Sequence, residues 1–197
     1  MAGRGRPRQF DETAAVAAAG ELFWMNGFSA TSLDDLAGEM GMNRPSIYRA
    51  FGDKESLYRL ALARFCEGMS RAMADTLFSD ASLARGLKRF YREALNIYCE
   101  GTVPKGCMVM GTAVVAATCH PEIRQDLSLT IREIDARLEE RMRAAVEAGE
   151  LRTDFEVKDR AALAQGLLHT LSIRSRAGES RARLNRLVAS GVSMLLA

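Results

Sequence analysis

The chain has few of the side chains that usually support catalysis or metal binding. It contains two histidines among its 197 residues and none of the patterns H-E-x-x-H, G-x-S-x-G or the phosphate-binding P-loop. Its four cysteines lack C-x-x-C spacing, so neither a zinc site nor a disulfide framework is indicated. We therefore expect no enzyme, no bound metal and no cofactor.

Long apolar runs are also missing. No stretch reaches the roughly 18 apolar residues that a membrane span requires, so no membrane partner is expected. The N-terminal segment MAGRGRPRQF lacks the apolar core of a secretory signal, which predicts a cytoplasmic protein. The net charge of +2 is too small to indicate a nucleic-acid partner by itself. Its distribution is more informative, because Arg4, Arg6 and Arg8 lie in a flexible basic arm, residues 1–9, that contains no acid.

Prolines are few, and no stretch shows the alternating pattern of a β-strand. Apolar residues instead recur at helical spacing along most of the chain, which predicts an all-α fold. We expect helices over residues 10–26, 32–40, 43–51, 52–77, 79–98, 107–118, 120–149, 157–176 and 180–196. The helix over residues 52–77 is long enough to join two domains.

Residues 32–57 carry the most specific pattern in the chain. Ser32 and Asp35 form a capping-box pattern at the start of a short helix, and Gly41 can adopt the left-handed conformation that ends it. Asn43 is the next N-cap candidate, and Pro45 lies in the first helical turn, where its missing N–H is not needed. Two short helices separated by a tight glycine turn are typical of a helix-turn-helix motif.

The second helix of this motif has one apolar and one polar face. Ile47 and Phe51 lie four residues apart and are expected to face the core. The opposite face carries Arg44, Ser46, Tyr48 and Arg49. Because a recognition helix presents such side chains to base edges in the major groove, the leading hypothesis is DNA binding.

The stretch from about residue 10 to residue 65 resembles the N-terminal DNA-binding domain of the TetR/AcrR family of bacterial transcriptional regulators. The resemblance rests on the segments ELFWMNGFSATS, LDDLAGEMGM, NRPSIYRAF and GDKESLY. It implies a three-helix helix-turn-helix domain, residues 10–55, which a long helix joins to a larger helical domain for effector binding and dimerisation, residues 56–197. It also implies that Tyr48 and Lys54 contact the DNA backbone.

The side chains expected to contact DNA come from the arm, the motif and the start of the long helix. They are Arg4, Arg6, Thr31, Ser32, Asn43, Arg44, Pro45, Ser46, Tyr48, Arg49 and Lys54. Arg44 and Arg49 fit either bidentate contacts to guanine or contacts to phosphate. The arm fits either an A·T-rich minor groove or a solubilising tail. Because Asp34, Asp35 and Glu39 would repel DNA, we expect them to point away from it or to pair with arginines.

The larger domain carries methionines and aromatic residues that suit either an effector pocket or a plain core. The pocket candidates are Phe65, Met69, Met73, Phe90, Tyr98, Cys99, Cys107, Met110, Val114 and Leu127. They include no cluster of charges, so the expected effector is a small and largely apolar molecule.

The last two helices carry apolar stripes that fit either a bundle with a second copy of the chain or packing within the monomer. The candidate interface residues are Leu163, Leu167, Leu171, Leu184, Leu187, Val188, Gly191, Met194 and Leu195. A homodimer would place two recognition helices on a palindromic DNA site.

Cys107 follows a P-K-G loop and is expected near a helix N-terminus, where the helix dipole and Lys105 would lower the pKa of its thiol. It fits either a sensor of electrophiles or oxidants, with Cys99 or Cys119 as the resolving thiol, or a buried apolar residue.

The motif and the resemblance together predict a transcriptional repressor. It would leave its palindromic double-stranded operator when an effector binds in the larger domain. An activator, a thiol-based sensor that uses Cys107, and a DNA-architectural protein without an effector are the alternatives.

Overall fold

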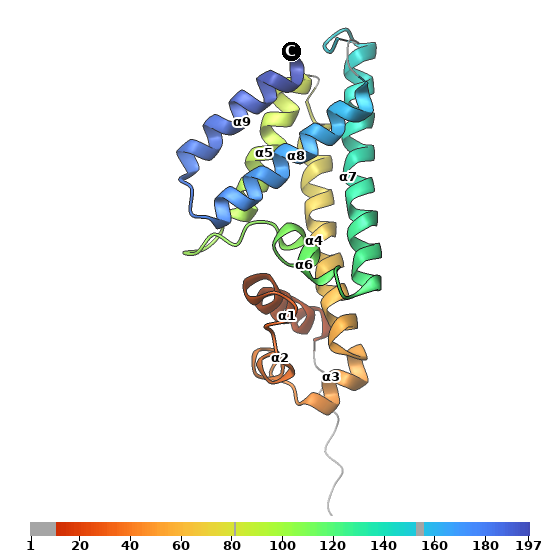
Figure 1. Cartoon of the computed structure of the whole chain (residues 1–197), viewed down its shortest axis with the longest axis vertical. Coiled ribbons are helices and arrows are strands. Elements are labelled where there is room, and N and C mark those ends of the chain that lie inside the picture. Colours follow the sequence, from red (N-terminus) through yellow and green to blue (C-terminus); the bar gives the residue numbers. More distant parts are fainter. Residues whose placement is uncertain (1–10, 81, 153–155) are drawn as a thin grey trace, which may run out of the picture. The chain divides into compact units, whose positions relative to one another are not determined.

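The computed structural model describes residues 11–80, 82–152 and 156–197, and within these residues the regular secondary structure is helical, without a β-strand (Figure 1). This confirms the predicted all-α fold. The contacts divide the chain into two compact units, Met1–Ala61 and Leu62–Ala197. Helix α4 (Lys54–Leu77) begins in the first unit and continues into the second.

The first unit is built around aromatic side chains. Its helices are α1 (Glu12–Asn26), α2 (Leu33–Met40), α3 (Arg44–Phe51) and the first turns of α4. The ring of Tyr58 meets the rings of Phe23 and Phe28 edge-on, with centroid distances of 5.1 Å and 5.2 Å. Leu36 from α2 and Ile47 from α3 are fully buried. Since short helices are marginal alone, this shared core stabilises the helix-turn-helix motif.

The local signals in residues 32–57 form as predicted. The Ser32 hydroxyl accepts the Asp35 N–H at 3.1 Å, and the Asp35 carboxylate accepts the Ser32 N–H at 2.9 Å, which completes the capping box. Gly41 is left-handed, with φ 61° and ψ 29°. The Asn43 side chain accepts the Ser46 N–H at 2.9 Å and caps α3. These hydrogen bonds confirm the expected boundaries of both short helices.

The second unit contains the rest of α4 and the helices that follow it. They are α5 (Leu83–Tyr98), η1 (Val109–Ala113), α6 (Val114–Ala116), α7 (Pro121–Glu147), α8 (Val157–Arg176) and α9 (Arg181–Leu196). Helix α8 packs obliquely against α7, and α9 packs against α5 and α8 (Figure 1). The Tyr91 hydroxyl donates to the Ala164 carbonyl at 2.8 Å and so links α5 to α8. Among the described helices, none is long and apolar enough to cross a membrane.

The segment expected as one α-helix over residues 107–118 contains a π-helical turn, so that prediction was wrong in detail. The Val114 N–H bonds to the Val109 carbonyl five residues back, which is the π-helical pattern. The segment also lies very close to α8. A Cβ on Gly106 would stand 2.8 Å from the Ser172 carbonyl oxygen, and the Cys107 N–H donates to the Ser172 hydroxyl at 2.8 Å. The π-helical turn follows directly after this contact with α8.

Candidate nucleic-acid interface and ligand cavity

The outer face of α3 presents the side chains expected on a recognition helix. Ile47 and Phe51 are buried beneath the helix, as predicted. The side chains on the other side are exposed or half-buried, namely Asn43, Arg44, Pro45, Ser46, Tyr48 and Arg49. This polar face carries two guanidinium groups and a phenol hydroxyl, which can reach base edges and phosphates.

Arg44 is held by Asp34 from α2. The Arg44 Nε donates to one Asp34 oxygen at 2.6 Å, and its Nη2 donates to the other oxygen in a bidentate ion pair. This hydrogen bonding lowers the pKa of Asp34, so the pair is fully ionised at neutral pH. The expectation that Asp34 pairs with an arginine is confirmed. The pair uses two of the five N–H donors of Arg44 and fixes the direction of its guanidinium.

Two of the expected phosphate contacts have other roles in the structure. Thr31 is fully buried, and its hydroxyl donates to the Gly27 carbonyl at 2.7 Å. The prediction that this hydroxyl meets a phosphate was therefore wrong, because the α1–α2 turn uses it internally. The Lys54 ammonium donates to the carbonyls of Phe28 and Thr31 at 3.1 Å each and lies 4.4 Å from the centre of the Phe28 ring. Lys54 thus ties the start of α4 to that turn.

Ser32 remains exposed at the N-terminus of α2, although its hydroxyl is engaged with Asp35 in the capping box. Its position agrees with a contact to phosphate through the first N–H groups of α2. Arg4 and Arg6 lie outside the described residues, and the proposed arm contacts stay predictions.

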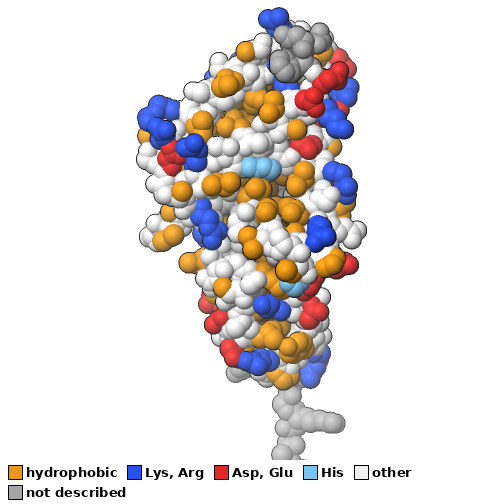
Figure 2. All heavy atoms as spheres, viewed as in Figure 1, with side chains coloured by type: hydrophobic (Ala, Val, Ile, Leu, Met, Phe, Trp, Pro, Cys, Tyr) orange, Lys and Arg blue, Asp and Glu red, His pale blue; other side chains and the backbone are white. Residues whose placement is uncertain are grey.

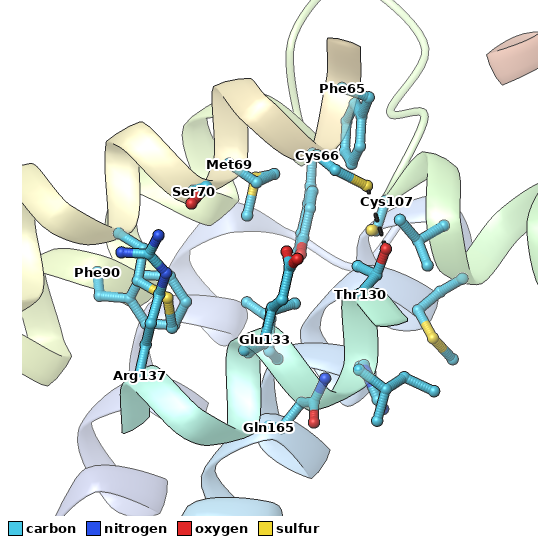
Figure 3. A pocket seen from close by; sticks show the side chains of 18 residues that line it. Phe65, Cys66, Met69, Ser70, Phe90, Cys107, Thr130, Glu133, Arg137 and Gln165 are labelled. Carbon is cyan, nitrogen blue, oxygen red and sulfur yellow. Dashed lines mark hydrogen bonds between the residues drawn. The ribbon is translucent and has the colours of Figure 1, made fainter. Parts of the chain in front are cut away.

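The second unit contains a partly open cavity with about 40 Å³ open to the centre of a water-sized sphere. Seven of the ten predicted pocket residues line it: Phe65, Met69, Met73, Phe90, Tyr98, Cys107 and Met110. Figure 3 shows side chains from α4 and from α7 directed toward the same space. The space is therefore walled mainly by apolar side chains, and the three methionines and three aromatic residues that the sequence suggested are among them.

Three predicted pocket residues do not line this cavity. Val114 follows the π-helical turn and is 41% exposed. Cys99 lies one residue beyond the end of α5 and does not line the cavity, whereas Tyr98, the last residue of α5, does. Leu127 lies on α7 about one turn before the lining residue Thr130.

The sequence reading missed the contribution of α7 and α8 to the cavity. The additional lining residues are Cys66, Ser70, Val109, Thr130, Ile131, Glu133, Ile134, Arg137, Gln165, Leu168 and His169. On α7 the lining positions recur at helical spacing, but they mix apolar, polar and charged side chains. A search of the sequence for apolar stripes therefore does not detect these residues.

The thiols of the cavity are poorly ionised. Burial raises the pKa of the Cys107 thiol, and the backbone N–H groups of Val109 and Met110 oppose this effect without cancelling it. Burial also raises the pKa of Cys66 to about 11. Cys66 lines the same cavity, whereas Cys99 and Cys119 do not. The expected lowering of the Cys107 pKa was therefore wrong, because desolvation outweighs the helix terminus.

The residues predicted for the dimer interface divide into a buried set and an exposed set. Leu171, Leu184, Val188 and Leu195 are buried within the single chain, so packing of α8 and α9 in the monomer uses these four. A Cβ on Gly191 would stand 2.5 Å from a methyl group of Leu167, which shows how closely the two helices approach.

The exposed set of predicted interface residues comes from both α8 and α9. Leu163 is 62% exposed and Met194 is 78% exposed, and Leu167, Leu187 and Gly191 are partly exposed. Ile173, which the sequence did not single out, is 60% exposed on α8. Figure 2 shows hydrophobic side chains over the part of the surface that α8 crosses.

An exposed recognition helix in one unit and a lined cavity in the other define a helix-turn-helix regulator with a separate helical ligand domain. Residues 15–61 match the family described as bacterial regulatory proteins, tetR family, and residues 83–190 match the tetracyclin repressor-like C-terminal domain. The chain therefore belongs to the TetR family of bacterial transcriptional regulators, which are DNA-binding proteins and not enzymes.

Individual relatives agree with this assignment. The chain is 28% identical to the HTH-type transcriptional repressor ComR of Escherichia coli K12 over 182 residues, 92% of this chain and 87% of ComR. It is 35% identical to the HTH-type transcriptional repressor BdcR of the same organism over 106 residues, 54% of each chain. A solved structure of a cysteine mutant of the TetR family regulator CifR with a 26-base-pair operator DNA matches with 32% identity and a TM-score of 0.85. That match covers 96% of this chain and 98% of the other, and the predicted DNA-binding regulator is confirmed.

Proposed function

We propose that the protein is a homodimeric repressor that leaves its operator when a small, uncharged and largely apolar molecule occupies the cavity of the second unit. The cavity is the observation that carries this proposal. Helix α4 lines it with Phe65, Met69 and Met73, and the same helix supplies Leu57 and Tyr58 to the core of the recognition unit. ComR and BdcR are described as repressors, which supports the direction of regulation.

Coupling between the cavity and DNA requires two states of the protein that differ in the position of α4. The ligand must bind these two states with different affinity. Such a difference shifts the population of the DNA-binding state, with coupling free energies of typically about 1–3 kcal/mol. Because the lining includes three methionines, Met69, Met73 and Met110, it can repack around a ligand at small cost.

For DNA recognition, we assign base reading to Arg44 and Arg49 and phosphate contact to Tyr48. The first two carry exposed guanidinium groups on α3, and the Tyr48 hydroxyl is the exposed phenol of the same face. The remaining contacts would come from Ser32, Asn43, Pro45, Ser46, Arg4 and Arg6. We also propose that the protein is cytoplasmic, because a bacterial regulator acts on chromosomal DNA there.

For dimerisation, we assign the exposed apolar side chains of α8 and α9. Leu163, Leu167, Leu187, Gly191 and Met194 lie on these two helices and are at least partly open to solvent. A second copy of the chain would cover them and place two recognition helices on a palindrome.

The test of DNA recognition is selection of genomic fragments by the purified full chain at a near-physiological salt concentration of about 0.15 M. We expect one short palindrome to be recovered. The double variant Arg44→Ala, Tyr48→Ala should then bind that site more weakly, by about 5- to 150-fold for each base contact that is lost. Fluorescence anisotropy with the labelled palindrome measures the change.

The matched control is Arg143→Ala, which removes an exposed arginine from α7 that pairs with Glu139. It should bind the palindrome as the native chain does. Enrichment of A·T-rich fragments without a common motif would instead identify a DNA-architectural protein. Native affinity of the Arg44, Tyr48 double variant would refute the assigned recognition face.

A further inference from the structure

Two buried polar groups at the cavity have no hydrogen-bond partner among the described residues. They are the hydroxyl of Tyr98 and the side-chain amide nitrogen of Gln165. Tyr98 is fully buried, Gln165 is 3% exposed, and both residues line the cavity. The Cys107 thiol lies beside the Tyr98 hydroxyl but makes no hydrogen bond of ordinary geometry with it. Because buried polar groups in folded proteins are nearly always paired, two unpaired groups at one cavity favour a bound molecule as their hydrogen-bond partner.

A second tyrosine on the same helix shows that this is not a general feature of α5. Tyr91 lies two turns before Tyr98 and is also fully buried, but its hydroxyl donates to the Ala164 carbonyl at 2.8 Å. Tyr91 does not line the cavity. Of these two buried phenols, only Tyr98, which lines the cavity, lacks a hydrogen-bond partner among the residues that the structure describes.

The charges around the cavity do not favour a charged ligand. Glu133 and Arg137 line it from α7 and carry opposite charges four residues apart. His169 also lines it, and burial lowers the pKa of His169 more than Asp135 raises it, so this imidazole is neutral at pH 7. Tyr98 stays protonated because burial raises its pKa well above the ordinary value. Besides the opposite charges of Glu133 and Arg137, the wall thus offers two neutral hydrogen-bond donors, the Tyr98 hydroxyl and the Gln165 amide, among mainly apolar side chains.

We infer that the effector is an uncharged molecule with a compact apolar body and one or two hydrogen-bond-accepting oxygens, as in a small ketone, ester or alcohol, held by the Tyr98 hydroxyl and the Gln165 amide. This inference rests on the proposed function, because it names the ligand of the same cavity. The open space of about 40 Å³ equals that of about three water molecules, which limits the ligand to a few heavy atoms before the methionines repack.

Four cyclic probes of similar size separate the oxygen acceptor from size and charge. Cyclopentanone carries the acceptor, and methylenecyclopentane replaces that oxygen with a methylene group of similar shape. Cyclopentanecarboxylate and cyclopentylamine carry a negative and a positive charge. Isothermal titration calorimetry on the full chain measures binding, and anisotropy with the labelled operator measures release from DNA. We expect cyclopentanone to bind tightest of the four and to weaken DNA binding.

Two variants remove the unpaired groups with little change in shape. Tyr98→Phe and Gln165→Leu should each reduce the affinity for cyclopentanone by about 2- to 12-fold, the range for one lost hydrogen bond, and leave the affinity for methylenecyclopentane unchanged. Tyr91→Phe is the matched control, because it removes a paired phenol outside the cavity. It should keep the preference for the ketone.

Thermal unfolding of the ligand-free variants gives a readout independent of binding. Tyr98→Phe should keep or raise the Tm, because it removes an unpaired buried hydroxyl, whereas Tyr91→Phe should lower it. An equal fall in both variants would show that Tyr98 already has a partner, and would overturn the inference. So would equal affinity for cyclopentanone and methylenecyclopentane, or no binding of cyclopentanone. The proposed function fails separately, if cyclopentanone saturates the cavity and the affinity for operator DNA does not change.

Discussion

The cavity brings together two cysteines that the chain separates by 41 positions, and both are protonated at neutral pH. Cys66 lies near Thr130, with its sulfur 3.6 Å from the threonine hydroxyl oxygen, and burial raises its pKa to about 11. Burial likewise raises the pKa of Cys107. Because the thiolate is the nucleophile, both side chains behave as small apolar wall groups in the resting protein. A sensor role for Cys107 would need a ligand or a movement that first lowers its pKa.

Alkylation with iodoacetamide at pH 7.5 should therefore label exposed Cys119 first and the two cavity thiols slowly. A pKa raised from 9 to about 11 lowers the thiolate fraction of Cys66 roughly 100-fold, and its labelling rate should rise about tenfold per pH unit below that pKa. Peptide mass mapping of timed samples measures each rate, and the denatured chain is the control in which the differences disappear. Labelling of Cys107 as fast as Cys119 at neutral pH would instead indicate an activated thiolate.

At the scale of elements, patterns among neighbouring residues predicted the helix boundaries, whereas contacts between distant segments could not be predicted. The capping box at Ser32, the left-handed Gly41 and the Asn43 cap are decided by neighbouring residues, so the sequence was sufficient for the helix-turn-helix motif. The cavity walls depend on which helices meet in space. Lining residues such as Glu133 and Gln165 carry no pattern that distinguishes them from a solvated or a core face.

The π-helical turn was unpredictable for a similar reason. It follows residues 106–107, which approach Ser172 on α8, a contact between segments 65 residues apart. No local pattern in residues 107–118 reports that contact, and their small and apolar composition suits an ordinary helix.

Gly106→Ala tests this close approach. Gly106 has φ 68°, and the added Cβ would stand 2.8 Å from the Ser172 carbonyl oxygen, so the variant meets both backbone strain and a steric clash. Gly101→Ala is the matched control, because Gly101 has φ 82° but open space around the added Cβ. We expect Gly101→Ala to cost about 1–2 kcal/mol of unfolding free energy and Gly106→Ala about 1–3 kcal/mol more. Urea unfolding measures both, and equal losses would mean that the contact with α8 contributes nothing.

At the scale of the whole molecule, the exposed apolar side chains of α8 and α9 are available to a second copy of the chain. Leu163 and Met194 are the most exposed of the predicted interface residues. Leu171 and Leu184 on the same two helices are fully buried and support the monomer instead. Substitutions at the exposed positions can therefore separate assembly from folding.

The double variant Leu163→Glu, Met194→Glu should be a folded monomer with much weaker operator binding, because two charges would be buried without partners in the dimer. Analytical ultracentrifugation measures the assembly state, and circular dichroism checks that the helices remain. Val103→Glu is the matched control, since Val103 is 65% exposed on the loop that follows α5 and belongs to neither α8 nor α9. A double variant that stays dimeric would place the interface elsewhere.

The ion pair between Asp34 and Arg44 has a consequence for how the protein finds its site on a chromosome. Until the correct bases arrive, the guanidinium already has an anionic partner within its own subunit. Phosphates, which are the same at every position, would have to compete with that carboxylate, so encounters with random sequence would be short. If Arg44 reads a guanine, as proposed, the base edge would supply two acceptors in a fixed geometry in place of the carboxylate. On that assignment, the carboxylate on α2 would shorten the residence time on random DNA relative to that on the operator, and the search through the genome would be faster.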